Sequence, residues 1–572
     1  MTSLSGGTPA YPLGGAGRRL ISGWVRDMPA SPAALLALAG LPVVAAAWAL
    51  LSPPLLLSKT MTQDLLFNLA GAWHIHSGQV AHVDFHDPTG RLSFVLTALG
   101  FDLLGPGPFA FLVNVAVMAA VLFAAAILAA MRRLPLLPAA IFVVFVSLVA
   151  LMPANVGDRP EQYTFAMSYN RYGWSAYSIL ALVLLVPPHG SDDGRRDRRV
   201  WIDVPVAAVL LAAMFYLKIT YFAAGLGTLA FALLFQRHVG RHWKAWLIVS
   251  ALLVLNVLAP YNQAYVADIL HWAQSGAART ALTMHVNNFL ASIGQYAPYL
   301  VAIVVALWMW WSRRATFRVP LTLAFLLATS FFLLSQNSQS AGLPTGIVVL
   351  LILYDRLRAA FATLGNRDVV PWLLMLLLFP ALDTASAAAS VAGYHARARS
   401  SDGLYVVDRT NLRGLALPDG ERGVFLSFSY SFDYPGRSKD GSARPLYQLS
   451  DHEYVLALME AADLMASREP GTIALLDSVN PLPFMLGYQP ARAGNLWSSW
   501  SAPLPPAEDY LAGVRYVLVP KFPTTPQWTD DLLRLYGPYL RAHFEVATET
   551  RCWTLLARVS GGGPSLSLYN GH

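Results

Sequence analysis

The chain has 572 residues, of which 55% are hydrophobic and only 13% charged, against about 25% charged in an ordinary soluble domain. The mean hydropathy of +0.46 indicates an integral membrane protein. The formal net charge of +7 does not indicate a nucleic-acid partner, because Lys and Arg lie mainly in short clusters between apolar runs, as in the cytoplasmic loops of membrane proteins. The single cysteine, Cys552, excludes an intrachain disulfide.

The chain begins with a polar segment followed by a long apolar run. Residues 1–31 are rich in Gly, Pro and Ser and contain Arg18, Arg19 and Arg26, which predicts a disordered cytoplasmic N-terminus. Residues 32–57 form an apolar run too long for the core of a cleavable signal peptide. This run predicts an uncleaved first membrane helix that leads outward, so that an outer loop follows at residues 58–91.

Apolar runs and basic clusters alternate along residues 32–385 and predict about eleven membrane spans. After the first span we expect spans at 108–131, 136–153, 173–186, 204–217, 220–235, 245–259, 297–311 and 319–335, one before the basic segment 355–368, and one at 369–385. Residues 92–105 are apolar but short, and we expect them at the outer interface. Further outer loops are expected at 154–172 and 260–296. The odd count places the two termini on opposite sides.

Residues 386–572 have the composition of a soluble α/β module, which the topology makes periplasmic. Segments 423–432, 471–478 and 514–521 have the β-branched and aromatic content of buried strands, and 454–467 repeats apolar residues at helical spacing. The last strand is expected near 552–559. The sequence therefore predicts an α-helical polytopic membrane protein with a C-terminal soluble α/β domain. It contains no P-loop, dinucleotide-binding fingerprint, zinc spacing or nucleophile elbow.

The first outer loop, 58–91, concentrates polar chemistry on an otherwise apolar chain, which usually marks function in a membrane protein. Asp64 lies near the start of a short helix that we expect to be amphipathic and to rest on the membrane. It is read either as a helix N-cap or as a general base facing an acceptor hydroxyl. Further along, His82 and Asp84 belong to the tract HVDFHD. The histidine spacing matches no zinc pattern.

The second outer loop, 154–172, is acidic and aromatic. Asp158, Glu161 and Asn170 are its polar candidates. Arg171 lies on the outer side, where basic residues are scarce, and its guanidinium suits phosphate or carboxylate. The aromatic side chains at 163, 169, 172 and 174 are expected mainly as an interfacial belt. We predict no metal ligand, although a divalent cation on Asp64, Asp84 or Glu161 stays open.

Two further candidates lie outside these loops. Lys218 is a lone cation between two apolar runs at the outer interface. It either snorkels to lipid head groups or binds a lipid-linked phosphate. Gln336, in a later outer loop, is a weak candidate for binding sugar hydroxyls.

With these residues in place, residues 32–385 resemble the GT-C superfamily of membrane glycosyltransferases, which use polyprenyl-phosphate sugar donors. The resemblance rests on the long first span, an outer loop with an early acidic residue (Asp64), then Gly78, the tract DFHDP at 84–88, an acidic and aromatic second outer loop, and a span ending in lysine (Lys218). The adjacent acidic pair of the protein mannosyltransferases and lipid A aminoarabinose transferases is absent, since Leu65 follows Asp64. This departure argues against protein or lipid A as the acceptor.

The resemblance implies particular roles. Asp64 would be the catalytic base, and acidic residues of the loops would assist it, with Glu161, Asp158 and Asp84 as the nearest candidates. Lys218 or Arg171 would lie near the donor phosphate. Tyr169, Asn170, His82 and Gln336 complete the expected substrate-binding set.

The expected activity is an inverting sugar transfer from a polyprenyl-phosphate donor to a periplasmic glycan or lipid-linked acceptor, in the bacterial inner membrane and without an obligatory cofactor. A transporter or flippase is the main alternative, but it would be expected to carry ionisable residues at mid-span. An O-antigen ligase or polymerase is another alternative. A ligase would favour arginine-rich outer loops, whereas 260–296 contains only Arg279.

Overall fold

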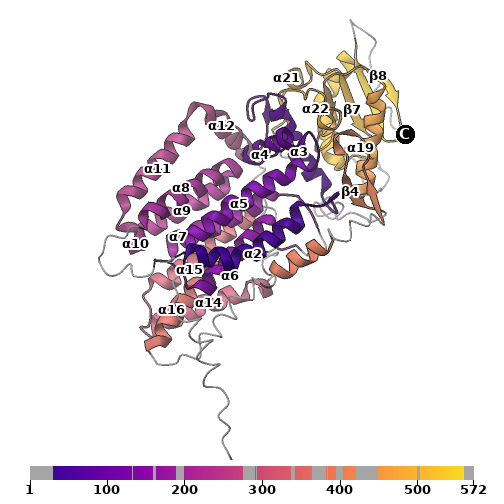
Figure 1. Cartoon of the computed structure of the whole chain (residues 1–572). Coiled ribbons are helices and arrows are strands. Elements are labelled where there is room, and N and C mark those ends of the chain that lie inside the picture. The colour runs from indigo at the N-terminus through magenta and orange to yellow at the C-terminus, as the bar shows by residue number, and fades with distance from the viewer. Residues whose placement is uncertain are drawn as a thin grey trace, which may run out of the picture.

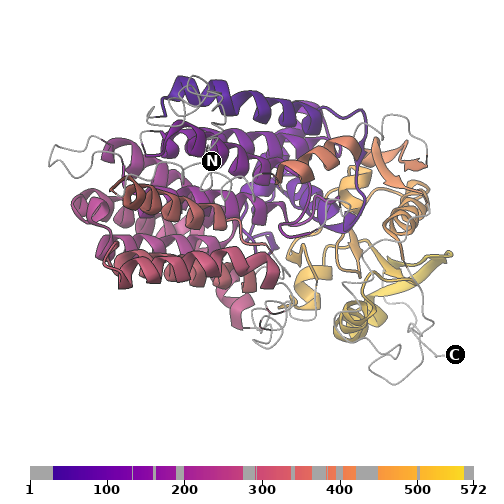
Figure 2. The same ribbon diagram turned by 90° about the horizontal axis from the view of Figure 1, so that it is seen from below.

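The computed structural model describes residues 30–131, 133–158, 163–188, 199–274, 293–336, 342–363, 384–394, 403–419, 449–498 and 503–559, with the single positions 286, 290 and 382. A bundle of helices forms the larger part, and an α/β region covers one of its ends (Figure 1). The helices run roughly parallel or antiparallel to one another in the view from below (Figure 2).

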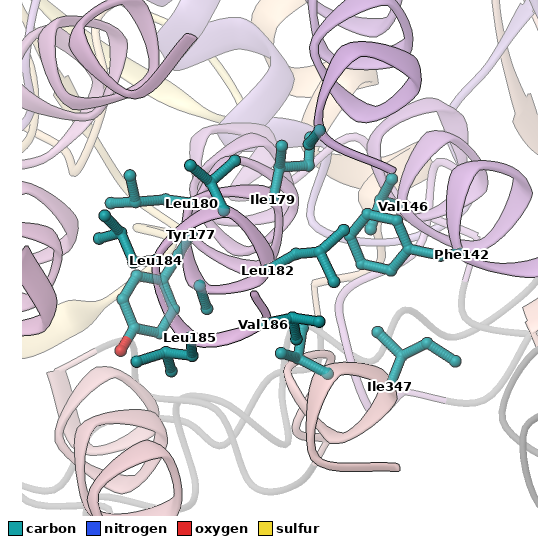
Figure 3. Packing of buried hydrophobic residues seen from close by; sticks show 14 of the residues in the cluster. Phe142, Val146, Tyr177, Ile179, Leu180, Leu182, Leu184, Leu185, Val186 and Ile347 are labelled. Carbon is teal, nitrogen blue, oxygen red and sulfur yellow. The ribbon is translucent and has the colours of Figure 1, made fainter. Parts of the chain in front are cut away.

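The bundle consists mainly of apolar helices, most of whose bounds follow the predicted runs, while the helices at 237–240 and 260–274 lie between predicted spans. They are α2 (Pro32–Leu51), α5 (Ala110–Ala130), α6 (Leu136–Leu151), α7 (Ser168–Leu185), α8 (Val200–Leu217), α9 (Ile219–Phe235), the short α10 (Arg237–Gly240), α11 (Trp243–Leu258), α12 (Pro260–Gln274), α14 (Ile293–Trp311), α15 (Arg318–Gln336) and α16 (Gly346–Thr363). Helix α7 is central and packs against α5, α6, α8, α9 and α16. Its residues Ile179 and Leu182 are buried beside Phe142 of α6, with Ile347 of α16 close by (Figure 3).

The outer surface of the bundle is apolar, as lipid contact requires. Trp48 of α2 is 73% exposed and Leu252 of α11 is 60% exposed. Among the described helices, α2, α5, α8 and most of α15 are each long and apolar enough to cross a membrane, and α11 with α12 makes a fifth if the pair, bent by 78°, counts as one broken span. Shorter apolar helices, α4, α6 and α9 among them, accompany these. The predicted count of eleven and the sides of the termini stay predictions.

The first outer loop contains helix α3 (Thr62–His76), and α4 (Leu92–Leu104) follows it in the short apolar segment expected at the outer interface. The prediction that α3 is an amphipathic helix resting on the membrane is wrong. Its polar residues Gln63 and Asn68 are each only 4% exposed, as buried as its apolar face, because α4 covers one side and α20 (Leu482–Leu486) of the C-terminal region packs on another. The helix is therefore fixed between two parts of the protein rather than free at a lipid surface.

The C-terminal region is an α/β module, as predicted. Its main sheet has the strand order β5-β7-β9-β8, with β5 and β7 parallel and the other pairs antiparallel. The strands are β5 (Ile473–Leu475), β7 (Tyr516–Pro520), β8 (Phe544–Glu549) and β9 (Trp553–Arg558), and the helices that accompany them are α19 (Asp451–Ala466), α21 (Ala507–Leu511) and α22 (Pro526–His543). The predicted strands at 471–478 and 514–521 and the helix at 454–467 are confirmed. The expected strand at 423–432 and most of the expected span at 369–385 lie outside the described residues.

The first outer loop and the C-terminal region share two small sheets. Strand β1 (Leu56–Leu57) pairs in parallel with β4 (Leu415–Pro418), which also pairs with β3 (Leu404–Val406). Strand β2 (Phe85–His86) pairs in parallel with β6 (Gly494–Asn495). Both ends of the loop that carries Asp64 are therefore held by backbone hydrogen bonds from residues more than 300 positions away, which gives that loop a defined shape.

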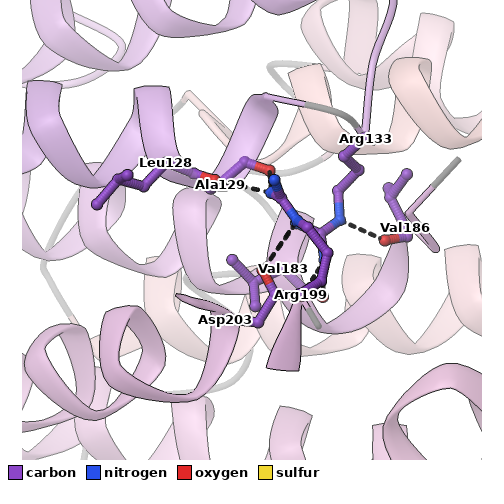
Figure 4. Close-up of polar contacts among 7 residues, drawn as sticks. All are labelled: Leu128, Ala129, Arg133, Val183, Val186, Arg199 and Asp203. Atoms are coloured by element: carbon purple, nitrogen blue, oxygen red, sulfur yellow. Dashed lines mark hydrogen bonds and ion pairs between the residues drawn. The ribbon is translucent and has the colours of Figure 1, made fainter. Parts of the chain in front are cut away.

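At the other end of the bundle, a buried ion pair ties three helices together (Figure 4). Arg133, which is 1% exposed, donates to the Asp203 carboxylate from Nη2 at 2.8 Å and to the carbonyl of Val186 from Nε at 2.6 Å. Arg199 adds a hydrogen bond to the carbonyl of Leu128 at 2.8 Å. These contacts connect the ends of α5 and α7 with the first turn of α8.

We expect the Arg133→Met substitution to lower the free energy of unfolding by about 3–5 kcal/mol, because it leaves Asp203 as a poorly compensated buried charge. Thermal unfolding in detergent measures the effect. The double variant Arg133→Met with Asp203→Leu is the control, since replacing both charges with apolar groups should recover most of the loss. A single variant that melts like the unchanged protein would contradict a stabilising role for this pair.

Candidate functional site

Three segments meet where α8 ends and α9 begins. The carbonyl of Leu217 accepts a hydrogen bond from the Gly90 N–H at 2.9 Å. The carbonyl of Phe215 accepts one from the Tyr265 hydroxyl at 2.9 Å. A Cβ on Gly90 would lie 2.1 Å from the carbonyl oxygen of Tyr216, so that only glycine permits this close approach. The first outer loop and α12 are thereby fastened to the same end of the bundle.

Asp64 lies in the first turn of α3, close to two strained residues. Met61, which begins this helix, has φ of 55°, and Met167, whose backbone N–H donates to the Asp64 carboxylate, has φ of 48°. Non-glycine residues in this left-handed region cost about 1–3 kcal/mol each and persist only where the surroundings impose them. Burial raises the Asp64 pKa to about 7; the Met167 hydrogen bond opposes the rise, and the charge of Asp451 adds to it.

The N-terminus of α3 is capped from the C-terminal region. The Thr62 N–H donates to Asp451 Oδ1 at 2.6 Å, and Asp451 is itself the first residue of α19. Its side chain is buried, with 4% of the residue exposed. Asp64 is therefore not the cap of its own helix, because a residue 387 positions away in the chain supplies that contact. This leaves the Asp64 carboxylate for another role.

Lys218 and Tyr169 lie next to each other in this site. The Lys218 ammonium is 5.4 Å from the centre of the Tyr169 ring, within the range of a cation–π contact. Burial lowers the pKa of Lys218 to about 8, and the charge of Asp87 opposes that shift. Burial, then the charges of Asp64 and Asp87, raise the pKa of the Tyr169 phenol. Tyr169 thus lies near Asp64 and Asp87, two acidic residues of the first outer loop, and it also contacts Lys218.

Asp87 is a second buried carboxylate of the site. It is 1% exposed, and its Oδ1 accepts hydrogen bonds from the backbone N–H of Thr89, at 2.7 Å, and from the Thr89 hydroxyl. Its Oδ2 is buried without a hydrogen-bond partner among the described residues. Burial raises the Asp87 pKa to about 7, while the Lys218 charge lowers it. A buried carboxylate oxygen and a nearby ammonium therefore face the same region.

The carboxylate of Asp268, on α12, contacts both His82 and His86 and so fixes the segment that joins them. Its carboxylate is 3.0 Å from Nδ1 of His82 and 2.9 Å from Nδ1 of His86. Hydrogen bonding to Asp268 raises the pKa of His86. The sequence predicts an outer loop at 260–296, and within that segment the chain forms α12 after the sharp bend at residue 259. That bend carries Asp268 over the first outer loop.

The structure brings some of the predicted residues together and separates others. Asp64 and Lys218 form one group through Tyr169, since the Asp64 charge acts on the Tyr169 phenol and the Lys218 ammonium lies over its ring. His82 contacts Asp268, whose charge acts on Asp87. Asp84 is engaged elsewhere: its carboxylate accepts the Val80 N–H at 2.8 Å and pairs with Arg492 at 3.4 Å. These contacts give Asp84 a structural role between the loop and the C-terminal region.

Arg171 lies in the core and is 1% exposed. Its Nη1 donates to the carbonyls of Ala154, Thr164 and Ala166 at 3.3–3.5 Å, which holds the second outer loop onto α7. Burial lowers its pKa to about 10. Asn170 beside it is also 1% exposed. The geometry makes Arg171 a support for the loop, and its predicted contact with phosphate stays a prediction.

The prediction of an interfacial aromatic belt is wrong for the second outer loop. Tyr163, Tyr172 and Trp174 are each completely buried, because α7 is the central helix of the bundle. Asp158 is partly exposed, and burial raises its pKa while a hydrogen bond with Asn155 lowers it. Glu161 and the side chain of Gln336 lie outside the described residues.

Sequence reasoning missed Asp87, Asp268 and Asp451 as site residues. Asp87 was within the tract DFHDP, although Asp84 was preferred there. Asp268 and Asp451 carry no local signal, since each reaches the site from a distant part of the chain. Within the described ranges, no group of three or more His, Cys, Asp or Glu side chains is arranged to hold a metal ion. The divalent cation stays a prediction, because Glu161 lies outside those ranges.

No known family model and no curated protein matches this chain. Among solved structures, ArnT from Cupriavidus metallidurans bound to undecaprenyl phosphate is similar with a TM-score of 0.45 and 14% identity, over 94% of this chain and 100% of that one. The oligosaccharyltransferase of Archaeoglobus fulgidus in complex with Zn and sulfate has a TM-score of 0.37 and 10% identity, over 90% of this chain and 72% of that one. The archaeal oligosaccharyltransferase AglB from Archaeoglobus fulgidus, in complex with an inhibitory peptide and a dolichol-phosphate, has a TM-score of 0.35 and 11% identity, over 92% of this chain and 74% of that one.

Proposed function

We propose that this protein is a membrane glycosyltransferase of the GT-C type that transfers a sugar from a polyprenyl-phosphate donor to a hydroxyl of a glycan or lipid-linked acceptor. The observation that carries the proposal is the grouping of Asp64, Tyr169 and Lys218 at one end of an apolar helical bundle. A carboxylate with a pKa near neutrality and a buried ammonium are the two groups that this reaction needs.

Asp64 acts as the general base. A base works best when its pKa lies near the working pH, and the Asp64 pKa is about 7. The acceptor hydroxyl loses its proton to the Asp64 carboxylate as its oxygen attacks the anomeric carbon. The bond from that carbon to the phosphate oxygen breaks in the same displacement, which inverts the anomeric configuration.

Lys218 stabilises the leaving polyprenyl phosphate. Negative charge grows on the phosphate as the glycosidic bond breaks, and a fixed cation in a site that excludes water lowers the energy of that state. The Tyr169 ring limits the movement of the ammonium. Asp87 keeps the lysine protonated, because its charge opposes the effect of burial on the Lys218 pKa.

The donor reaches the site from the lipid. Leu255 and Leu258, at the end of α11 next to α12, are 64% and 65% exposed, and they offer an apolar path for a polyprenyl chain beside the site. The arginines of α10 and of the α14–α15 turn lie at the opposite end of the bundle. By the positive-inside rule that end is cytoplasmic, so the site and the C-terminal α/β region are periplasmic in the bacterial inner membrane.

The test uses purified full-length protein in nanodiscs, incubated with radiolabelled polyprenyl-phosphate sugars and candidate glycan or lipid-linked acceptors. We expect the label to move to the acceptor and to release unlabelled polyprenyl phosphate. In reconstituted vesicles, movement of labelled donor across the bilayer without transfer would identify a flippase and would overturn the proposal.

We expect the transfer rate to depend on pH as a bell-shaped curve with its maximum between about 7 and 8. The rate rises as Asp64 loses its proton through a pKa of about 7. It falls as Lys218 loses its proton through a pKa of about 8. A series of initial rates in overlapping buffers at constant ionic strength measures both limbs, and a rate independent of pH from 6 to 9 would contradict these two assignments.

A further inference from the structure

A basic cavity lies at the end of the bundle farthest from Lys218. Its volume is about 420 Å³, and it is lined by residues at the ends of α7 and α9, at the start of α15, in the middle of α16 and in α10. Helix α9 begins beside Lys218 and ends at Phe235. Seventeen helical residues rise about 25 Å, so the cavity is separated from the candidate functional site by the whole length of the helix (Figure 1).

Four arginines define the chemistry of this cavity: Arg237, Arg241, Arg318 and Arg356. No acidic side chain is among the described residues of its wall. Arg356 pairs with Asp355 outside the wall, with a separation of 3.8 Å. Guanidinium groups suit phosphate because their N–H donors form a planar fork that matches two phosphate oxygens.

His238 adds a neutral donor or acceptor to the same wall. Its Nε2 is buried and has no hydrogen-bond partner among the described residues. Burial lowers its pKa to about 4, and the neighbouring charges of Arg133 and Arg356 contribute to the fall. A buried ring nitrogen without a partner is costly unless a ligand or water satisfies it. Because the neutral ring also has a hydrogen bond with the backbone of Val183, Nε2 is open to a hydroxyl or water donor in the cavity.

The surroundings place the cavity at the level of lipid head groups. Leu234, next to the cavity-lining Phe235, is 76% exposed. Phe317, between two lining residues, is 51% exposed, and Trp311 at the end of α14 is 83% exposed. Large exposed aromatic side chains beside arginines are typical of the membrane interface.

Orientation of the protein in the membrane does not by itself account for this arrangement. The positive-inside rule needs cations near the ends of spans, and it does not require them to share one cavity. Arg313 and Arg314 meet that need in the same turn without lining the cavity, whereas Arg237, Arg241 and Arg318, which are also exposed, all lie on its wall. The four arginines of the wall are instead gathered around one space from α15, from α16, and from the short α10 with the residue that follows it.

We propose that this cavity binds a phosphate group, supplied by the head group of an anionic phospholipid in the leaflet opposite the candidate functional site. Basic pockets between membrane helices on the cytoplasmic side suit such head groups. The bound lipid connects the end of α9, the start of α15 and the middle of α16 and stabilises the bundle there. Binding at this place is independent of sugar transfer.

The test compares two double variants that each remove two positive charges. Arg237→Gln with Arg318→Gln changes the cavity, and Arg313→Gln with Arg314→Gln is the matched control outside it. Protein stripped of lipid in neutral detergent is titrated with phosphatidylglycerol or phosphatidylcholine, and native mass spectrometry measures the bound fraction. We expect phosphatidylglycerol to bind the unchanged protein and the control, with affinity about tenfold lower in the cavity variant.

Equal binding of phosphatidylglycerol by both variants, or equal binding of the two lipids, would overturn the proposal. A third arm titrates inorganic phosphate without lipid and follows the melting temperature. Stabilisation by phosphate that only the cavity variant loses, with no preference between lipids, would assign the cavity to a free phosphate and reject the lipid. If the double variant does not fold, Arg356→Gln alone takes its place in the same titrations.

Discussion

The Asp64→Asn variant is expected to fold normally and to lose about 10²–10⁴-fold in kcat. The amide keeps the size of the carboxylate but cannot take the proton of the acceptor hydroxyl. Folding should be preserved, because the α3 N-terminus is capped by Asp451 and not by Asp64. Loss of a buried carboxylate also removes a desolvation cost. Initial rates with saturating donor, together with a melting curve, separate the two effects.

Asp102→Asn is a suitable control for Asp64→Asn. Asp102 is an aspartate of the same outer loop region, on α4, and its exposed side chain pairs with His76 at 3.0 Å. Its replacement removes the same charge outside the candidate site and should leave the rate within a factor of about two, because exposed pairs contribute little. Turnover by Asp64→Asn at the level of this control would reject the general-base assignment.

Lys218→Met is expected to lower kcat/KM for the donor by about 10²–10³-fold, the usual loss when one charge-stabilising donor is removed. Methionine retains the length and apolar stem of lysine but not its charge. The fold should tolerate the change, since a buried ammonium with a pKa lowered to about 8 is costly to keep. The descending limb of the pH profile should disappear with the lysine, which a purely structural role would not predict.

Lys59→Met provides the comparison for this second variant. Lys59 also lies over a tyrosine ring, with its Nζ 5.1 Å from the centre of Tyr394, and is partly buried. It is outside the group formed by Asp64, Tyr169 and Lys218. If both lysine variants bind and use the donor equally well, Lys218 is an interfacial anchor and the proposed role in leaving-group stabilisation is wrong.

Much of the secondary structure was predictable because it depends on local sequence. The apolar runs at 108–131 and 204–217 became α5 and α8, and the β-branched segment at 514–521 became β7. Asp64 and Lys218 were also identifiable, since charged residues stand out on an apolar chain. The amphipathic reading of α3 failed because the sequence did not show that α4 and α20 would enclose the helix, with Ser93 and Thr97 of α4 hydrogen-bonded to Asn68.

The sequence by itself determined the membrane-protein character, the helices and strands, and the acid and the cation of the candidate site, because hydropathy and charge act over short stretches of chain. Only the tertiary structure decided that Asp268 holds His82 and His86, and that Asp451 caps the helix carrying Asp64. The Asp268 contacts depend on the bend between α11 and α12, and the Asp451 contact depends on the strand pairing between the first outer loop and the C-terminal region. Each joins segments more than 180 residues apart. Such contacts are set by packing, and packing leaves no periodic signal in the residues that it brings together.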